Sequence, residues 1–301
     1  MIMNIEELVK FDLRKTYLTD SQLAFWEENN ILFNTLWFDM NIGGPDVEFG
    51  YVAQKLFTIN EIYNSWTIIP KENAGYSLKS ESGIIITSDV MSGRWMFMKQ
   101  LMKADCKKNN RQELIEKLFD DIKIYRECKD EELCNILSNK YGRDQDHETW
   151  ENLLSYLDIV YTIGNLTPAG ANPGGNGYDN WTSKLTTLYK QYFFGSPASE
   201  KSIIHEWIPF LSEYYPIDDK ETACKEHREE QWKKFIEDNL FQPYVNEDMT
   251  VKHIDFTNLK EAIVQSRDMI LGRGELIRNN VIYSTKKYSL IDIPFGSIDI
   301  T

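Results

Sequence analysis

Apolar side chains recur at helical spacing along much of the chain, and this pattern predicts a protein built mainly from helices. Leucine, isoleucine and aromatic residues stand three or four positions apart in several stretches, so each stretch places its apolar side chains on one helix face. Gly272 and Gly274 interrupt the last of these stretches, so we expect a kink or a helix end there. The stretches are residues 110–162, 199–214 and 220–242, a segment beginning near Trp181, and Leu259 to about Asn279.

Short runs of β-type residues predict a few strands. The clearest is Gly83–Thr87, and we expect a helix over Ser88–Lys103 directly after it. The pattern as a whole predicts an α+β fold, mainly α-helical, with short strands near both ends. The other strand-like runs are Thr35–Phe38, Val281–Tyr283 and Ser289–Ile293.

The chain shows no internal repeat and no linker rich in glycine, serine or proline, so we expect a single globular unit over residues 1–301. The best candidate for a weak boundary is residues 104–112, where Lys107–Asn110 breaks the apolar pattern. Aromatic residues make up 13% of the chain and supply the apolar area that a disordered chain lacks. The composition therefore excludes disorder over most of the chain.

The chain is acidic, with 33 Lys and Arg against 47 Asp and Glu and a formal net charge of −14. Phosphate backbones are bound by clustered Lys and Arg, and the sequence offers no direct evidence of this kind for a nucleic-acid partner. Two interpretations of the acidity remain open. It keeps the protein dispersed in solution, or it presents an acidic surface to a basic protein partner. The wide spread of the carboxylates along the chain favours the first interpretation.

No run of about 18 apolar residues is present, so we expect no membrane span, and Met1–Lys10 lacks the apolar core of a secretion signal. The four cysteines are scattered, which is typical of a reduced, cytoplasmic protein. Cys224 and His227 could supply two metal ligands from one helix face, but no second pair completes a site. We therefore expect a cytoplasmic protein with no membrane partner, no metal and no cofactor.

The stretch from Gly164 to Asn180 differs from the rest because glycine, asparagine and proline dominate it. Loops held between rigid elements are where binding residues collect, and this loop is the candidate site. Its side chains would orient a substrate or metal and stabilise developing negative charge, although the pattern assigns no catalytic residue. The other interpretation is an ordered connector whose polar groups bond nearby backbone. The candidate binding residues are Asn165, Asn172, Asp179, Trp181 and Lys184.

The run Gly164–Thr167, followed by Asn172 and Lys184, resembles a Gly-Asn-Leu-Thr…Asn…Lys run in HNH-type nuclease domains of modification-dependent restriction enzymes. The resemblance implies metal-dependent hydrolysis, in which a histidine on a strand activates water beside a single metal ion. In the same resemblance, the asparagines orient the site. The one histidine upstream of the run is His147, which begins a predicted helix.

A second pattern comprises Phe11–Arg14, Leu36–Trp37 and a central run from Ile163 to Tyr189 that includes Pro168. It resembles an uncharacterised family of bacterial and prophage proteins that carry a domain of unknown function. This resemblance covers much of the chain loosely and implies no known activity.

These observations together favour a binding or interaction protein of bacterial or prophage origin, with a protein partner, acting in the conflict between phage and host. The alternative hypothesis is a metal-dependent hydrolase or nuclease that uses residues 164–184.

Overall fold

The computed structural model of the protein describes residues 2–13, 50–71, 75–93, 97, 147–169, 181–195, 207–217, 224–279 and 288–289. Several predicted features lie outside these residues. They are the strand-like runs Thr35–Phe38 and Val281–Tyr283, the candidate boundary at 104–112, and the candidate site residues Asn172 and Asp179.

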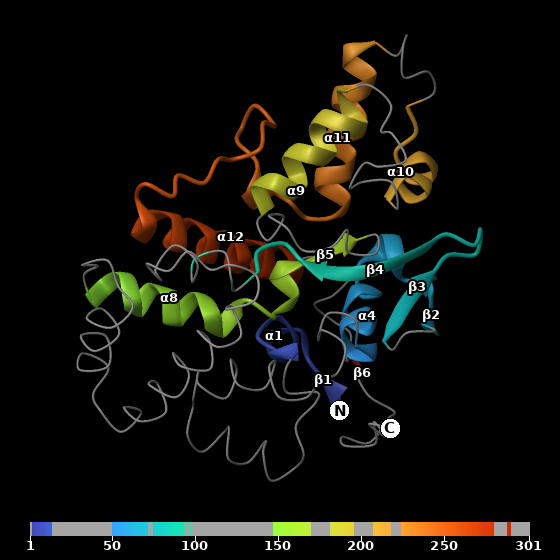
Figure 1. The fold of residues 1–301 in the computed structure, drawn as a ribbon. Coiled ribbons are helices and arrows are strands. Elements are labelled where there is room, and N and C mark those ends of the chain that lie inside the picture. Colours follow the sequence, from blue (N-terminus) through green and yellow to red (C-terminus); the bar gives the residue numbers. More distant parts are fainter. Residues whose placement is uncertain are drawn as a thin grey trace, which may run out of the picture.

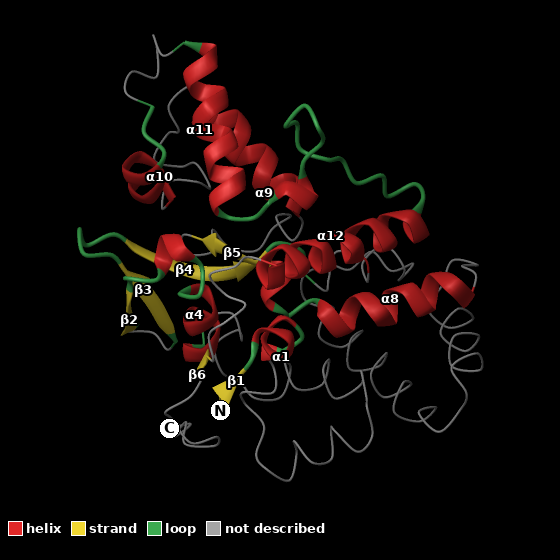
Figure 2. Cartoon of the chain, turned by 180° about the vertical axis from the view of Figure 1, so that it is seen from behind, coloured by secondary structure: helices red, strands yellow, loops and turns green. Residues whose placement is uncertain are grey.

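Two long helices, α8 (His147–Ile159) and α12 (Leu259–Asn279), lie side by side along one part of the molecule (Figure 1, Figure 2). Buried residues recur along α12 at helical spacing from Leu259 to Ile277, so the predicted helix is confirmed. The helix end expected near Gly272 and Gly274 is wrong, because the helix continues through both residues. Arg273, which stands between them, is buried and hydrogen-bonded across the core, and these bonds hold that turn in place.

A four-stranded antiparallel sheet lies next to this helix pair, and its strands follow the order β2-β3-β4-β5. The helix α4 (Tyr51–Phe57) contacts β2, β3 and β4. In Figure 1, α10 (Ile208–Tyr214) and α11 (Lys225–Asp238) lie above the sheet, and α4 lies below β4. The strands are β2 (Thr67–Pro70), β3 (Tyr76–Lys79), β4 (Ile85–Val90) and β5 (Leu166–Ala169).

The pairing of β4 with β5 corrects two expectations. Ser88 lies inside strand β4 and does not begin a helix, and residues 166–169 of the glycine-rich stretch form a strand. Ser88 pairs with Pro168, and its main-chain N–H donates to the side chain of Gln54 on α4 over 3.2 Å. Because both partners come from distant parts of the chain, the local pattern contains no sign of this strand pairing.

The remaining elements complete an α+β fold that is mainly helical, as predicted. The pairing of β1 with β6 brings the two ends of the described chain together, as Figure 1 shows. No helix in the described ranges has the length and apolar character needed to cross a membrane. The elements are β1 (Ile2–Met3), α1 (Ile5–Val9), η3 (Glu61–Tyr63), η5 (Ile163–Asn165), α9 (Trp181–Leu188), the π-helix η6 (Tyr189–Phe193), α10 (Ile208–Tyr214), α11 (Lys225–Asp238), η8 (Gln242–Tyr244) and β6 (Tyr288–Ser289).

An aromatic core joins α10 and α11 to the rest of the molecule. Phe235 of α11 is fully buried and lies within 6 Å, centroid to centroid, of the rings of Trp232, Phe193, Tyr215 and Phe241. Buried aromatic side chains provide large apolar contact areas, so this cluster fixes α11 relative to η6 and η8.

Candidate functional site

Asn165, the first candidate binding residue, is turned entirely into the protein. Its side-chain amide donates to the carbonyls of Ser92 and Val160 over 2.9 and 2.6 Å, and its side-chain oxygen accepts the Ser92 N–H over 3.0 Å. Its main-chain oxygen accepts the N–H of Met91. A buried amide that is bonded in this way satisfies main-chain groups that would otherwise be costly to bury.

Lys184, the last candidate, lies on α9 and is also engaged. Its ammonium group lies 2.5 Å from a carboxylate oxygen of Asp89 and donates as well to the carbonyl of Val90. The two side chains of the ion pair are 15% and 16% exposed. Trp181 is the first residue of α9. Lys184 therefore ties α9 to the end of strand β4.

Asn165 and Lys184 thus contact the same short segment, residues 89–92 at the end of β4. Both contacts are hydrogen bonds to main-chain groups or a side chain of that segment. This geometry favours the ordered-connector interpretation for residues 165–169. Asn172 and Asp179 lie outside the described residues, so their part in a site stays a prediction.

Arg273 is a central residue that sequence reasoning missed. It is 3% exposed, and its guanidinium donates to the carbonyls of Asn239, Gly164 and Leu166. The same group lies 4.5 Å from the ring centroid of Phe241. The only sequence signal was its position between two glycines in an otherwise apolar helix. Arg273 connects η5, β5 and the end of α11 to α12.

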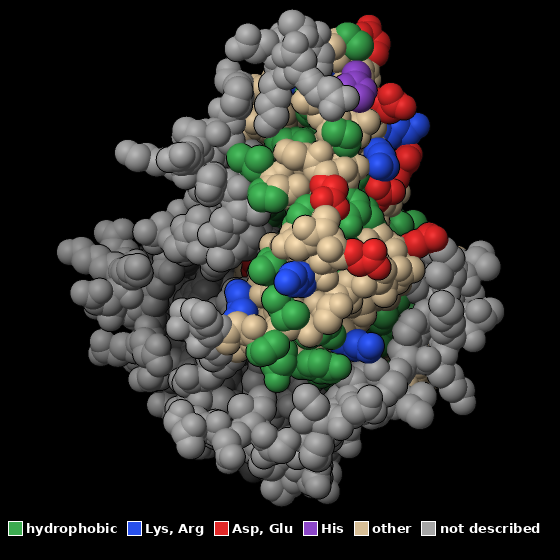
Figure 3. Space-filling view, turned by 90° about the vertical axis from the view of Figure 1, so that its right-hand side faces the viewer, with side chains coloured by type: hydrophobic (Ala, Val, Ile, Leu, Met, Phe, Trp, Pro, Cys, Tyr) green, Lys and Arg blue, Asp and Glu red, His purple; other side chains and the backbone are tan. Residues whose placement is uncertain are grey.

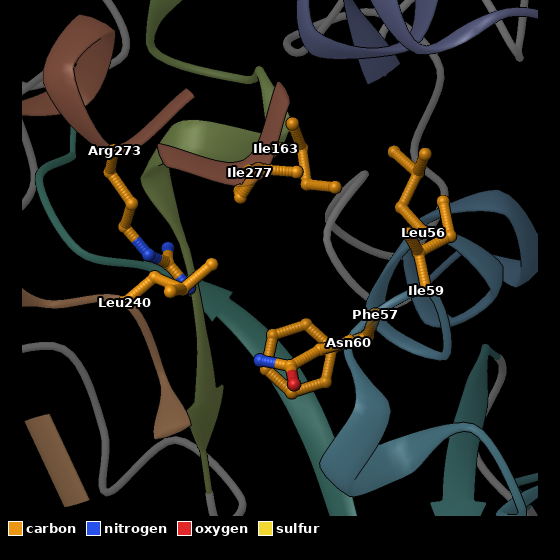
Figure 4. Close-up of a pocket in the computed structure, with 8 residues that line it drawn as sticks. All are labelled: Leu56, Phe57, Ile59, Asn60, Ile163, Leu240, Arg273 and Ile277. Atoms are coloured by element: carbon orange, nitrogen blue, oxygen red, sulfur yellow. The ribbon is translucent and has the colours of Figure 1, made fainter. Parts of the chain in front are cut away.

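A small cavity lies beside Arg273, between α4, η5 and α12 (Figure 4). Its volume of about 20 Å³ is room for a single water molecule, and most of its walls are apolar. The cavity therefore belongs to the core and is too small for a substrate. Its lining residues are Leu56, Phe57, Ile59, Asn60, Ile163, Leu240, Arg273 and Ile277.

The outer strand β2 is a second surface feature, since no described strand pairs with its far side. The face that carries β2, β3 and β4 shows hydrophobic side chains beside charged ones (Figure 3), and Ile85 is 52% exposed. The N–H of Lys71 donates to the carbonyl of Gly75, so these two residues form a hydrogen-bonded pair. Bonded and non-bonded pairs alternate along an antiparallel ladder, so the main-chain groups of Pro70, which pairs with Tyr76, point away from β3. Proline has no N–H to offer another strand, and such an edge resists strand addition.

A much larger hollow lies between residues 243–253 and α12. Its volume is about 640 Å³, within the range of binding sites for small molecules. Hereafter it is called the polar hollow. It is lined by Pro243, Asn246, Lys252, His253, Gln265, Asp268 and Met269.

The segment 243–253 forms one wall of the polar hollow and is fixed to α11. Val245 and Val251 form an antiparallel bridge, so the chain turns back on itself between them. Met249 in this turn has a φ of 64°, and its carbonyl accepts the indole N–H of Trp232 over 2.9 Å. Because Trp232 is buried in the aromatic core, this wall is anchored rather than loose.

The helix α12 forms the other wall. Gln265, Asp268 and Met269 stand on one face of the helix because they are three and four positions apart. The side-chain amide of Gln265 donates to the carbonyl of His253 over 3.3 Å, which joins the two walls. Met269 is buried and Pro243 is apolar, so the polar hollow combines apolar contact area with polar walls.

The two charged groups of the polar hollow differ in how they are compensated. One carboxylate oxygen of Asp268 accepts hydrogen bonds from both Nε and Nη2 of Arg267, each over 3.2 Å. Lys252 donates from its ammonium group to the carbonyl of Pro243 over 2.9 Å, and no carboxylate of the described residues lies within ion-pair distance of it. Among the described residues, the negative charge in the polar hollow is therefore paired, and the positive charge of Lys252 is not.

The predicted absence of a metal site is not tested by this structure. Within the described ranges, no three His, Cys, Asp or Glu side chains gather closely enough to hold a metal ion. Cys224 is exposed, and the Nε2 of His227 lies 3.1 Å from the carbonyl of Pro216.

Comparisons with protein-family models, with curated proteins and with solved structures found no match to this chain. The resemblances to HNH-type nuclease domains and to the uncharacterised bacterial and prophage family therefore stay predictions.

Proposed function

We propose that the protein works by binding a protein partner, and that the polar hollow is the surface that receives it. The observation that carries this proposal is that apolar and polar side chains together line an open hollow of about 640 Å³. Sites for small molecules usually enclose most of the ligand and are lined mainly by apolar side chains. An open hollow with charged and amide side chains is better suited to a protruding segment of another protein.

The bonds made by Asn165 and Lys184 favour binding over catalysis as the function. Every side-chain polar atom of Asn165 is bonded within the protein, so this amide has no group left to orient a substrate. Lys184 is held by Asp89, so its charge is already compensated. We propose a cytoplasmic bacterial or prophage protein, with the conflict between phage and host as its setting.

Photo-cross-linking tests the proposal. A photoreactive amino acid replaces Gln265 in the polar hollow of the full-length chain, and a matched variant carries it at Glu230, on the exposed face of α11. Both are expressed in bacterial cells, with and without phage infection, and irradiated. We expect a discrete product from position 265 that is missing from position 230, and its partner is then purified and titrated against the unmodified chain. No product at 265, or identical products from both positions, would contradict the proposal.

The alternative hypothesis, a metal-dependent hydrolase that uses residues 164–184, has its own test. Purified protein is incubated with DNA, RNA and nucleotides in the presence of Mg²⁺ or Mn²⁺. Turnover that is lost in both Asn172→Ala and Lys184→Ala would favour the hydrolase over the binding protein. We expect no turnover that depends on these two residues.

A further inference from the structure

Lys252 occupies a special position in the polar hollow because a hydrogen bond positions its ammonium group and no carboxylate in the part of the chain that the structure describes neutralises it. It is half-buried, and its bond to the carbonyl of Pro243 fixes the end of a side chain that is otherwise flexible. An ammonium group has three N–H donors, and one bond to a neutral carbonyl leaves capacity for an incoming acceptor. Hydrogen bonds from an ammonium group to a carboxylate are about twice as strong as those between neutral groups.

Two carboxylates close to Lys252 in the chain, Asp248 and Asp255, are engaged by other donors. Asp248 accepts the hydroxyl and the N–H of Thr250 over 2.6 and 3.0 Å. Asp255 accepts the same two groups of Thr257 over 2.6 and 2.9 Å. The Thr257 hydroxyl bond is the main cause that lowers the pKa of Asp255, and the charge of His253 adds a smaller contribution. These carboxylates stay ionised on their own local donors and do not compete for Lys252.

We propose that the polar hollow recognises an acidic side chain of the partner, whose carboxylate binds the ammonium group of Lys252. Pro243 and the buried Met269 would contact the aliphatic stem of such a side chain. The compensated charge of Asp268 lowers the repulsion that an acidic group would otherwise meet. This inference rests on the proposed function and adds the chemistry of the partner to it.

Nuclear magnetic resonance of the isotope-labelled full-length chain tests the inference with three capped tripeptides, Gly-Glu-Gly, Gly-Gln-Gly and Gly-Lys-Gly. We expect the glutamate peptide to shift the amide signals of residues 252–253 and 265–269 at millimolar concentration. The glutamine peptide should bind about tenfold more weakly, since it lacks the charge-assisted bond. Added salt should weaken only the glutamate peptide. Acetate serves as a fourth probe, because a response to acetate equal to that of the glutamate peptide would indicate a small-anion site and overturn the inference.

Two matched lysine variants complete the experiment. Lys252→Met should reduce the affinity for the glutamate peptide to that for the glutamine peptide, and Lys252→Arg should retain most of it. Lys234 also donates to a main-chain carbonyl, that of Tyr214, but lies outside the polar hollow, so Lys234→Met should change nothing. Equal binding of all three peptides, or full affinity in Lys252→Met, would overturn the inference while leaving the proposed function intact. No signal shift with any peptide would also overturn it, and the proposed function would then depend on the cross-linking result alone.

Discussion

Gly164 lies so close to Ile270 that a β-carbon added at Gly164 would overlap the carbonyl oxygen of Ile270. The main chain of η5 therefore contacts the main chain of α12 with no side chain between them. The guanidinium of Arg273, one helical turn beyond Ile270, donates to the carbonyl of Gly164 over 3.2 Å and strengthens the same junction. The glycine of the Gly-Asn-Leu-Thr run thus serves packing against α12, the helix that also forms a wall of the polar hollow.

Gly164→Ala should destabilise the protein by about 3 kcal/mol, because main-chain atoms cannot move aside as a flexible side chain can. Gly274→Ala is the matched control on α12, since a β-carbon there meets nothing within 4 Å. It should stabilise the helix by up to about 1 kcal/mol. Urea unfolding of both variants measures the difference, and equal effects would contradict the close approach of η5 and α12.

At position 240, glycine should give a more stable protein than alanine, in contrast to ordinary helical positions. It follows the end of α11 with a φ of 56°, and its N–H and that of Phe241 bond back to the carbonyls of Glu237 and Ile236. Left-handed backbone costs a residue with a β-carbon about 1 kcal/mol, so Leu240→Gly should be more stable than Leu240→Ala by about that amount. Thermal unfolding measures this difference. In the same assay, Ala262→Gly inside α12 should lower the stability, because glycine is less favourable than alanine within a helix.

The ion pair of Lys184 with Asp89 should contribute to stability. Lys184→Met should cost about 2 kcal/mol, between the values for exposed and buried pairs, because it leaves a half-buried carboxylate without its partner. A double-mutant cycle with Asp89→Asn isolates the coupling energy between the two side chains. Additive effects of the two substitutions would mean that the contact does not hold α9 to β4.

Alkaline pH should unfold the protein through its buried tyrosines. Burial raises the pKa of Tyr215 and Tyr244 in the folded state above the value of about 10 for an unfolded chain. A raised folded pKa means that this contribution to stability is complete below pH 10 and is lost as the pH rises through the folded value. Tyr244→Phe should therefore flatten the fall in stability above about pH 10. An unchanged profile in urea titrations at several alkaline pH values would contradict this assignment.

The helices could be predicted because their evidence is local. The apolar spacing from Leu259 to Ile277 lies within one helix, and the structure places α12 over the predicted residues. Strand β4 could not be predicted in full, since Ser88 is held by Pro168 and Gln54, which lie far away in the sequence. Local pattern contains no information about such pairings.

The candidate site shows the same limit. Asn165 became a candidate because it lies in a stretch rich in glycine, asparagine and proline. Its hydrogen-bond partners, however, include residues 91–92, more than seventy positions away in the sequence. The polar hollow could not be predicted, because Lys252 and Asp268 come together only when the segment 243–253 turns back beside α12. Neither residue belongs to a motif, so only the folded arrangement reveals them.

The most direct measurement of the central claim compares cross-linking from position 265 in two further variants, Lys252→Met and Lys184→Met, after circular dichroism has shown that both are folded. If recognition takes place in the polar hollow, the cross-linked product disappears in Lys252→Met and persists in Lys184→Met. A product of equal yield in Lys252→Met would contradict recognition of the partner through Lys252 in the polar hollow.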